Sequence, residues 1–363
     1  MSCVLCRDFV KTRILKINPK QPEADRILEA AHVVHSGGLV VFPTETVYGI
    51  AADCANPVAI KRLREVKRRN EDKPFSVMIS QKELIRNYTP YDDPTLFKLI
   101  DKYWPGPLTV IVPAEQGAKT IGIRIPDHPV ALKLVQNAHC TIAAPSANIE
   151  GNPPPVTCEE AMKDLDGLVD LAIDSGPVEI GTASTIVDFT QSHPTVVRKG
   201  VISQADVDAV TGKKHVLFVC TGNSCRSVMA EYLLRKMLKG RKDVEISSAG
   251  VSVIFPTSAS QEAVYVLKEQ GIDAEKHLSQ PVTNILLKKT DLIFVMTRAH
   301  RAQVLERVPG VEKRVYLLGE FQGRTVSREA DLDIADPIGK SHNEYQQCLQ
   351  MIQDCLGKVI GLI

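Results

Sequence analysis

The chain has 363 residues, of which 44% are hydrophobic and 24% are charged, and its formal net charge is +1. This composition is typical of a globular protein, and the length is sufficient for two domains. The near-zero net charge excludes a protein-wide field that would attract nucleic acid or an anionic membrane. Charged residues interrupt the apolar runs before they reach the roughly 20 residues of a membrane span. The sequence therefore predicts a cytoplasmic protein without a membrane partner.

In the first half, short apolar runs are separated by Pro and Gly, which predicts strands. The runs lie at 37–50, 74–80, 104–114, 121–129, 141–148, 182–189 and 194–200. Two helical patterns, Ala24–Ser36 and Pro57–Lys67, lie among them. This mixture predicts an α/β domain built around a twisted mixed sheet.

From His215 onward, strand and helix patterns alternate regularly. Strands are expected at 215–220, 243–250, 290–297 and 313–318, and helices at 228–238, 259–269, 299–308 and 343–360. This alternation predicts a small doubly wound parallel sheet. The polar segment 203–215 separates the two patterns, so we predict domains at 1–212 and 213–363.

The nine cysteines are odd in number and scattered, unlike the disulfide framework of a small secreted protein. Reduced thiols are therefore expected. Cys3 and Cys6 have the spacing of zinc ligands, but no second pair or histidine follows at a suitable distance. We predict no metal site made from protein side chains.

The segment "HVLFVCTGNSCRSVMAE" runs from an apolar strand into Cys220, and Arg226 follows in the next turn. The pKa of a thiol falls from about 8.5 to roughly 3.5–7.5 at a helix N-terminus or beside a cation. Backbone N–H groups of residues 221–226 can surround an anion, and Arg226 can bind two of its oxygens. The spacing therefore predicts a phosphate cradle with a nucleophile. The alternative is a buried, inert cysteine and an ordinary surface arginine.

The string "CTGNSCRS" at 220–227, with "SSAGV" at 247, "DLIFVMT" at 291 and "DIADPIG" at 333, resembles the low-molecular-weight protein tyrosine phosphatases. This resemblance extends from about His215 to the C-terminus. It implies that Cys220 attacks phosphorus and holds a cysteinyl-phosphate, that Arg226 binds the equatorial oxygens and that Asp336 is the general acid. It also implies that no cofactor is needed, and that the loop comprises Thr221, Gly222, Asn223, Ser224, Cys225 and Ser227, with Asn223 bracing the loop and Ser227 bonding to the thiolate.

Two departures leave the substrate open between phosphotyrosine and phosphoarginine. Ile338 and Gly339 stand where members that act on phosphotyrosine commonly carry aromatic residues, although Phe255 could supply an aromatic wall instead. Ser224 stands where the related bacterial protein arginine phosphatases have threonine.

Arsenate reductases and pseudophosphatases are two alternatives to a phosphatase for the string "CTGNSCRS". Thioredoxin-coupled arsenate reductases need two further cysteines after the third strand, where this chain has none. Cys348 and Cys355 lie in the last helical pattern instead. A pseudophosphatase would bind phosphate without turnover. Cys225 could also form a reversible disulfide with Cys220 under oxidation.

In the first half, "PTETVYG" at 43, Lys67-x-Arg69 with Lys73-Pro74, "WPGPLTV" at 104, "RIPDHP" at 124, "PSAN" at 145 and "VVRKG" at 196 occur in order. Taken alone, the cations at 67–73 are typical of a solvated helix end. The ordered set resembles the YrdC family, the threonylcarbamoyl-AMP synthases, over residues 10–205.

This resemblance implies that threonine, bicarbonate and ATP with Mg²⁺ give L-threonylcarbamoyl-AMP and pyrophosphate. A threonylcarbamoyl transferase would then use the product to modify adenosine 37 of tRNA. The residues implied in binding ATP and threonine are Thr44, Lys67, Arg69, Lys73, Arg124, Ser146, Asn148, Ser184 and Arg198. Ala183 departs from the acidic residue that members often carry there. The alternative is an RNA-binding module without catalysis. Double-stranded RNA or tRNA is a further partner that we expect this half could bind.

Overall fold

The computed structural model describes residues 11–69, 74–115, 119–322 and 332–363. The chain forms two compact units, one of Met1–Tyr91 and Leu99–Asp208, the other of Asp92–Lys98 and Ala209–Ile363. Among the described residues, no helix combines the length and apolar character needed to cross a membrane. Cys3, Cys6 and Lys73 lie outside the described residues.

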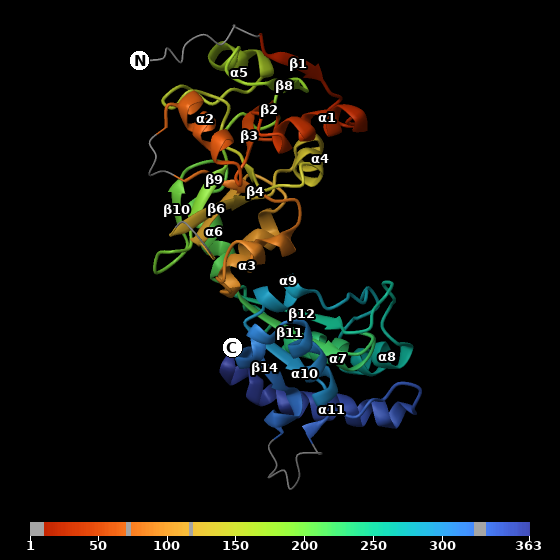
Figure 1. Cartoon of the computed structure of the whole chain (residues 1–363). Coiled ribbons are helices and arrows are strands. Elements are labelled where there is room, and N and C mark those ends of the chain that lie inside the picture. The colour runs from red at the N-terminus through yellow and green to blue at the C-terminus, as the bar shows by residue number, and fades with distance from the viewer. Residues whose placement is uncertain (1–10, 70–73, 116–118, 323–331) are drawn as a thin grey trace. The chain divides into compact units, whose positions relative to one another are not determined.

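The first unit is built on a ten-stranded mixed sheet (Figure 1). Its strands lie in the order β1-β8-β2-β3-β7-β4-β6-β5-β9-β10. Their bounds are β1 Arg13–Lys16, β2 Val40–Phe42, β3 Gly49–Asp53, β4 Val77–Met78, β5 Leu108–Pro113, β6 Thr120–Arg124, β7 Ile142–Ala143, β8 Leu171–Asp174, β9 Thr185–Asp188 and β10 Thr195–Arg198. Parallel pairs such as β5 with β9 occur beside antiparallel pairs such as β5 with β6. The predicted mixed sheet is confirmed.

Helices cover both faces of this sheet because successive strand residues point to opposite faces. Val40 and Phe42 of β2 pack with α1 and α4, whereas Val41 packs with α2 and α5. The helices of this part of the chain are α1 Ala24–His35, α2 Pro57–Lys67, α3 Pro94–Tyr103, α4 Pro129–Asn137, α5 Cys158–Leu165 and α6 Gln204–Thr211, with a 3₁₀ helix at Lys82–Asn87.

The second unit contains a four-stranded sheet in which every pair is parallel, in the order β12-β11-β13-β14. The strands are β11 Lys214–Cys220, β12 Val244–Gly250, β13 Leu292–Val295 and β14 Val315–Leu317; the helices are α7 Arg226–Met237, α8 Gln261–Glu269, α9 Asn284–Lys289, α10 Arg298–Arg307 and α11 His342–Val359. Phe218 of β11 packs with α7, α8 and α11, whereas Leu217 and Val219 pack with α9 and α10. This is the predicted doubly wound arrangement.

The segment 203–215, which we predicted as the domain boundary, contains the helix α6. The hydroxyl of Ser203 donates to Asp206 Oδ2 at 2.6 Å, and the backbone N–H of Asp206 donates to Ser203 Oγ at 3.2 Å. Val207 and Val210, one helical turn apart, are both buried. A reciprocal cap and an apolar pair therefore stabilise a helix whose composition is mostly polar.

Candidate active sites

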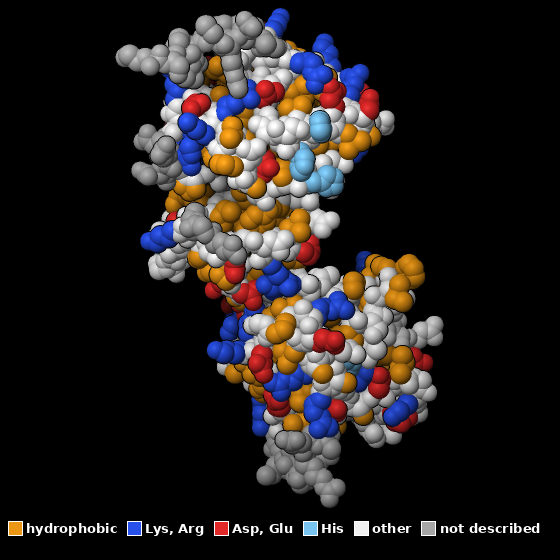
Figure 2. Space-filling model, viewed as in Figure 1, with side chains coloured by type: hydrophobic (Ala, Val, Ile, Leu, Met, Phe, Trp, Pro, Cys, Tyr) orange, Lys and Arg blue, Asp and Glu red, His pale blue; other side chains and the backbone are white. Residues whose placement is uncertain are grey.

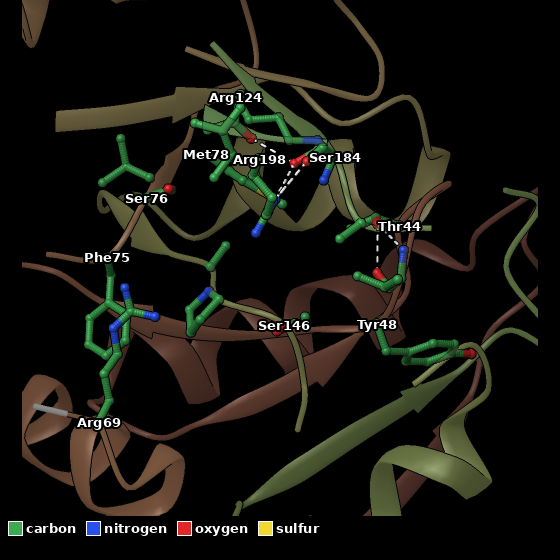
Figure 3. Close-up of a pocket in the computed structure, with 18 residues that line it drawn as sticks. Thr44, Tyr48, Arg69, Phe75, Ser76, Met78, Arg124, Ser146, Ser184 and Arg198 are labelled. Carbon is green, nitrogen blue, oxygen red and sulfur yellow. Dashed lines mark hydrogen bonds between the residues drawn. The ribbon is translucent and has the colours of Figure 1, made fainter. Parts of the chain in front are cut away.

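A cavity of about 130 Å³ lies in the first unit (Figure 3). Its lining comes from strands and loops far apart in the sequence. Six of the nine predicted residues line it: Thr44, Arg69, Arg124, Ser146, Ser184 and Arg198. The tertiary structure thus brings most of the predicted set together.

Three guanidinium groups face this cavity, and among the described residues that line it there is no carboxylate. Burial lowers the pKa of Arg69 and of Arg198, and for Arg198 the neighbouring Arg124 and Arg69 lower it further. Cations that lose water and repel one another gain most from a bound anion. The electrostatics therefore favour a polyanionic ligand.

Arg198 is fixed at one end of the cavity by Ser184. Its Nε and Nη2 donate to the Ser184 carbonyl oxygen at 3.0 and 2.8 Å, and Nη2 also lies 2.8 Å from Ser184 Oγ. The hydroxyl of Thr109 lies 2.8 Å from the same Oγ. Hydrogen bonds therefore hold the Arg198 side chain against Ser184, as Figure 3 shows.

Arg124 is held by groups beneath the cavity. Its Nη2 donates to Glu45 Oε1 at 2.7 Å and to Thr46 Oγ1 at 2.8 Å, and its Nε donates to the Gly106 carbonyl at 3.2 Å. Arg124 and Glu45 are both buried. The ion pair limits Arg124 to few rotamers, which prepares it for a ligand.

Thr44 lies in a turn that its own hydroxyl stabilises. Thr44 Oγ1 donates to the Val47 carbonyl at 2.7 Å and accepts the backbone N–H of Thr46 and Val47, each at 3.2 Å. On the opposite side of the cavity, the Arg69 guanidinium lies 5.1 Å from the centre of the Phe75 ring (Figure 3). The turn and the stacked arginine enclose the space between them.

Lys67 and Asn148 do not line this cavity. Lys67 Nζ donates to the carbonyls of Ser146 and Asn148 at 2.6 and 2.5 Å and lies 3.2 Å from Asn148 Oδ1. Burial, and then the charge of Arg69, lowers the pKa of Lys67 to about 8. The structure thus gives Lys67 the role of fastening the loop that carries Ser146, and direct contact of Lys67 or Asn148 with substrate stays a prediction.

In the second unit, Cys220 ends β11 and the loop that follows leads directly into α7. Cys220 Sγ lies 3.0 Å from Ser227 Oγ and accepts the backbone N–H of Asn223 at 3.3 Å. A Cβ on Gly250 would lie 2.6 Å from the Thr221 carbonyl oxygen, so only glycine lets β12 approach the loop this closely. Cys220, Ser227 and the loop therefore lie together, and their catalytic roles stay predictions.

Asn223 adopts a left-handed conformation with φ of 52° and connects the loop to its surroundings. Its Nδ2 donates to Ser227 Oγ at 3.0 Å and to Ser248 Oγ at 2.7 Å. Its Oδ1 accepts the backbone N–H of Gln280 at 3.0 Å. Asn223 therefore connects the loop to α7, to β12 and to Gln280, and its bracing role stays a prediction.

Arg226 begins α7 and is buried. Its Nη1 donates to the Ile334 carbonyl at 3.0 Å, and its Nη2 bonds to Asp336 Oδ2. Asp336 is partly exposed and therefore accessible from solvent. The guanidinium and the carboxylate expected to act on phosphate thus already lie side by side.

Comparisons with known proteins identify both halves. The family model described as "Telomere recombination", for Sua5, YciO and YrdC, matches residues 32–200, and that of the low molecular weight phosphotyrosine protein phosphatases matches residues 215–361. The putative threonylcarbamoyl-AMP synthase of Methanocaldococcus jannaschii is 34% identical over 201 residues, which cover 53% of this chain and 95% of that protein. A probable low molecular weight protein-tyrosine-phosphatase of Ralstonia nicotianae is 38% identical over 140 residues, which cover 39% of this chain and 89% of that protein. The chain belongs to both families.

The matches to the synthases cover only part of each chain. The threonylcarbamoyl-AMP synthase of Bacillus subtilis is 39% identical over 203 residues, which cover 53% of this chain. This chain spans about three fifths of the length of the first curated synthase relatives, 58% and 63%. The crystal structure of Pyrococcus abyssi Sua5 complexed with L-threonine matches with a TM-score of 0.53 and 22% identity, over 94% of this chain and 98% of that one. At that identity the match shows a shared fold.

The YrdC-like cavity also includes residues that sequence reasoning missed. Phe75, Ser76 and Met78 line it from the segment around β4, and Thr109 and Ile186 line it from β5 and β9. The available signal was the position of "PFSVM" directly after the cationic cluster. Thr109 and Ile186 gave no local signal, because pairing of β5 with β9 brings them together.

In the phosphatase half, Cys348 and Cys355 are both buried in α11. Burial is the main cause that raises the pKa of each thiol to about 12. Such thiols are poor nucleophiles for a disulfide relay. Among residues 11–69, 74–115, 119–322 and 332–363, no cluster of three His, Cys, Asp or Glu side chains could hold a metal ion.

Proposed function

We propose that the first unit forms L-threonylcarbamoyl-AMP and pyrophosphate from threonine, bicarbonate and ATP, for the modification of adenosine 37 in tRNA. The observation that carries this proposal is the cavity that three guanidinium groups face, found in a YrdC-family chain. Relatives named threonylcarbamoyl-AMP synthase and the threonine complex of Pyrococcus abyssi Sua5 support the substrate class.

The chemistry requires positioning more than a protein nucleophile, because the carbamate of threonine attacks the α-phosphate. Arg69, Arg124 and Arg198 would neutralise phosphate and carboxylate oxygens, and Thr44 and Ser146 would orient threonine. The described part of the lining offers no carboxylate, and nucleotide oxygens and water would hold Mg²⁺ there.

The test is release of pyrophosphate from ATP, with threonine and bicarbonate omitted in turn. Release that needs both co-substrates is expected, and Arg198→Ala should reduce it. Release without either would refute the synthase. A non-catalytic RNA-binding module would bind tRNA without releasing pyrophosphate, and the face shown in Figure 2 carries Lys and Arg interspersed with Asp and Glu instead of a continuous basic surface.

We propose that the second unit hydrolyses a phosphorylated protein through a cysteinyl-phosphate. Cys220 would attack phosphorus while Asp336 protonates the departing group, and Asp336 would then take a proton from the water that releases phosphate. Arg226 and the loop N–H groups would hold the equatorial oxygens throughout. The contact of Cys220 with Ser227, close to Arg226 and Asp336, carries this proposal.

The phosphorylated residue is decided by comparing matched phosphotyrosine and phosphoarginine peptides. Cys220→Ser is the control for adventitious hydrolysis. Preference for phosphoarginine would assign Ser224 the role of the threonine in the arginine phosphatases, whereas preference for phosphotyrosine would direct attention to Phe255, which is 76% exposed. Arsenate reduction is disfavoured by the buried thiols of α11.

A further inference from the structure

His300 has no role in the proposed chemistry, although it contacts the phosphate loop directly. It lies in the first turn of α10 and is 5% exposed. Its Nε2 is 2.9 Å from Thr221 Oγ1, and its Nδ1 is 2.9 Å from Thr297 Oγ1. Thr221 is the residue that directly follows the nucleophile.

The same end of α10 also holds the segment that carries the general acid. The backbone N–H of Arg298 donates to Asp333 Oδ1 at 2.9 Å. Just before the helix, the Met296 carbonyl accepts the N–H of Ile334 at 2.8 Å. Asp336 follows two residues later, so a single helical turn contacts both the nucleophile loop and the acid segment.

The chemistry of His300 suits a permanent link. Burial, and then the charge of Arg226, lowers its pKa to about 4, while Asp336 and Asp333 act in the opposite direction. At neutral pH the imidazole therefore offers one N–H donor and one acceptor nitrogen. Hydroxyl groups can donate or accept, so Thr221 and Thr297 complete both bonds in either tautomer.

We propose that His300 is a positioning residue that sets the acid segment in register with the nucleophile loop. The proposal rests on the phosphatase activity proposed above. The connection runs from Thr221 through His300 to Thr297 and Arg298, and from there to Asp333 and the segment of Asp336. If this link is lost, Asp336 no longer delivers its proton in step with attack by Cys220.

The expected signature is a dependence on the leaving group. In 4-nitrophenyl phosphate the leaving group departs as a stabilised anion, whereas in phenyl phosphate it needs a proton more strongly. His300→Phe keeps an aromatic ring but removes both hydrogen bonds. Its kcat/KM, which reports the first chemical step, should fall about tenfold for phenyl phosphate and less than about twofold for 4-nitrophenyl phosphate.

Thr221→Val removes the same bond from the other side and should reproduce this selective loss. The double variant should lose no more than either single variant, because the two side chains act through one bond. His342→Asn is a matched control, since His342 lies at the start of α11, where it pairs with Glu269 at 3.2 Å and packs against Tyr265.

Equal losses on the two substrates, or additive losses in the double variant, would overturn the inference. If His300→Phe does not fold, Thr221→Val alone gives the same comparison of the two esters. A wild-type protein without activity on both esters and both phosphopeptides would instead refute the proposed phosphatase.

Discussion

The two candidate sites both suit phosphate, but they are assembled in different ways. In the phosphatase half, one continuous segment from Cys220 to Ser227 supplies the proposed nucleophile, the N–H groups and the guanidinium. In the YrdC half, separate elements supply Arg69, Arg124 and Arg198 to one cavity. Backbone donors at the start of a helix suit a single small phosphoryl group, whereas separated cations suit an extended ligand with several charged groups.

This difference affects how the two sites tolerate substitution. A cradle with one nucleophile and one arginine has no second group that can replace either of them. A cavity with three guanidinium groups shares the charge of its ligand among them. Single substitutions should therefore abolish one activity and only weaken the other.

The largest effect is expected for Cys220→Ser, because a hydroxyl does not replace the thiolate as a nucleophile. Phosphatase turnover should fall by about three orders of magnitude or more. Pyrophosphate release by the same protein should be unchanged, and both are measured on one preparation. Residual turnover above a few per cent would show that Cys220 is not the nucleophile.

A matched pair of arginine substitutions tests the comparison directly. Arg226→Lys removes bidentate contact and should lower phosphatase kcat/KM about 100-fold. Arg198→Lys should raise the KM for ATP about tenfold, or about 1.4 kcal/mol, because Arg69 and Arg124 remain. Steady-state kinetics measure both effects. Similar fold-losses at the two sites would contradict the expectation that the cavity with three guanidinium groups tolerates substitution better than the cradle with one.

Acid pH should destabilise the second unit through His300. Its pKa is about 4 in the folded protein and near 6.5 when unfolded, so the unfolded chain binds more protons between these values. The free energy of unfolding should therefore fall by about 2–3 kcal/mol from His300 as the pH drops from 7 to 4.5. Urea denaturation of wild type and His300→Asn measures this, and an equal pH dependence in the two proteins would be evidence against it.

Alkaline pH should stabilise the first unit through Lys67. Its pKa is about 8 when folded, below the 10.5 that is usual for a lysine in water, so the unfolded chain again binds more protons as the pH rises through this range. Stability should rise by about 1 kcal/mol between pH 7 and pH 9. The increase should be absent in Lys67→Met, measured by the same denaturation experiment, and its persistence in that variant would assign it to another group.

Both sheet architectures were predictable from the sequence because they follow from local patterns. Alternating apolar runs predicted the mixed sheet, and regular strand-helix alternation predicted the parallel one. The helix α6 was missed because its polar composition concealed the buried pair Val207 and Val210. The short strand β1 was missed because its two apolar residues stand between two cations, and because it gains its partner from β8, far along the chain.

The sequence by itself determined the phosphate cradle, because residues 220–227 are contiguous and their spacing already specifies a loop that enters a helix. It also identified most of the side chains of the cavity, through an ordered set of motifs. Only the tertiary structure decided which of these side chains meet. It placed Lys67 beneath the loop of Ser146, paired Arg124 with Glu45 and brought His300 against Thr221. Such contacts join residues far apart in the chain, and they depend on strand order and packing, which no local pattern specifies.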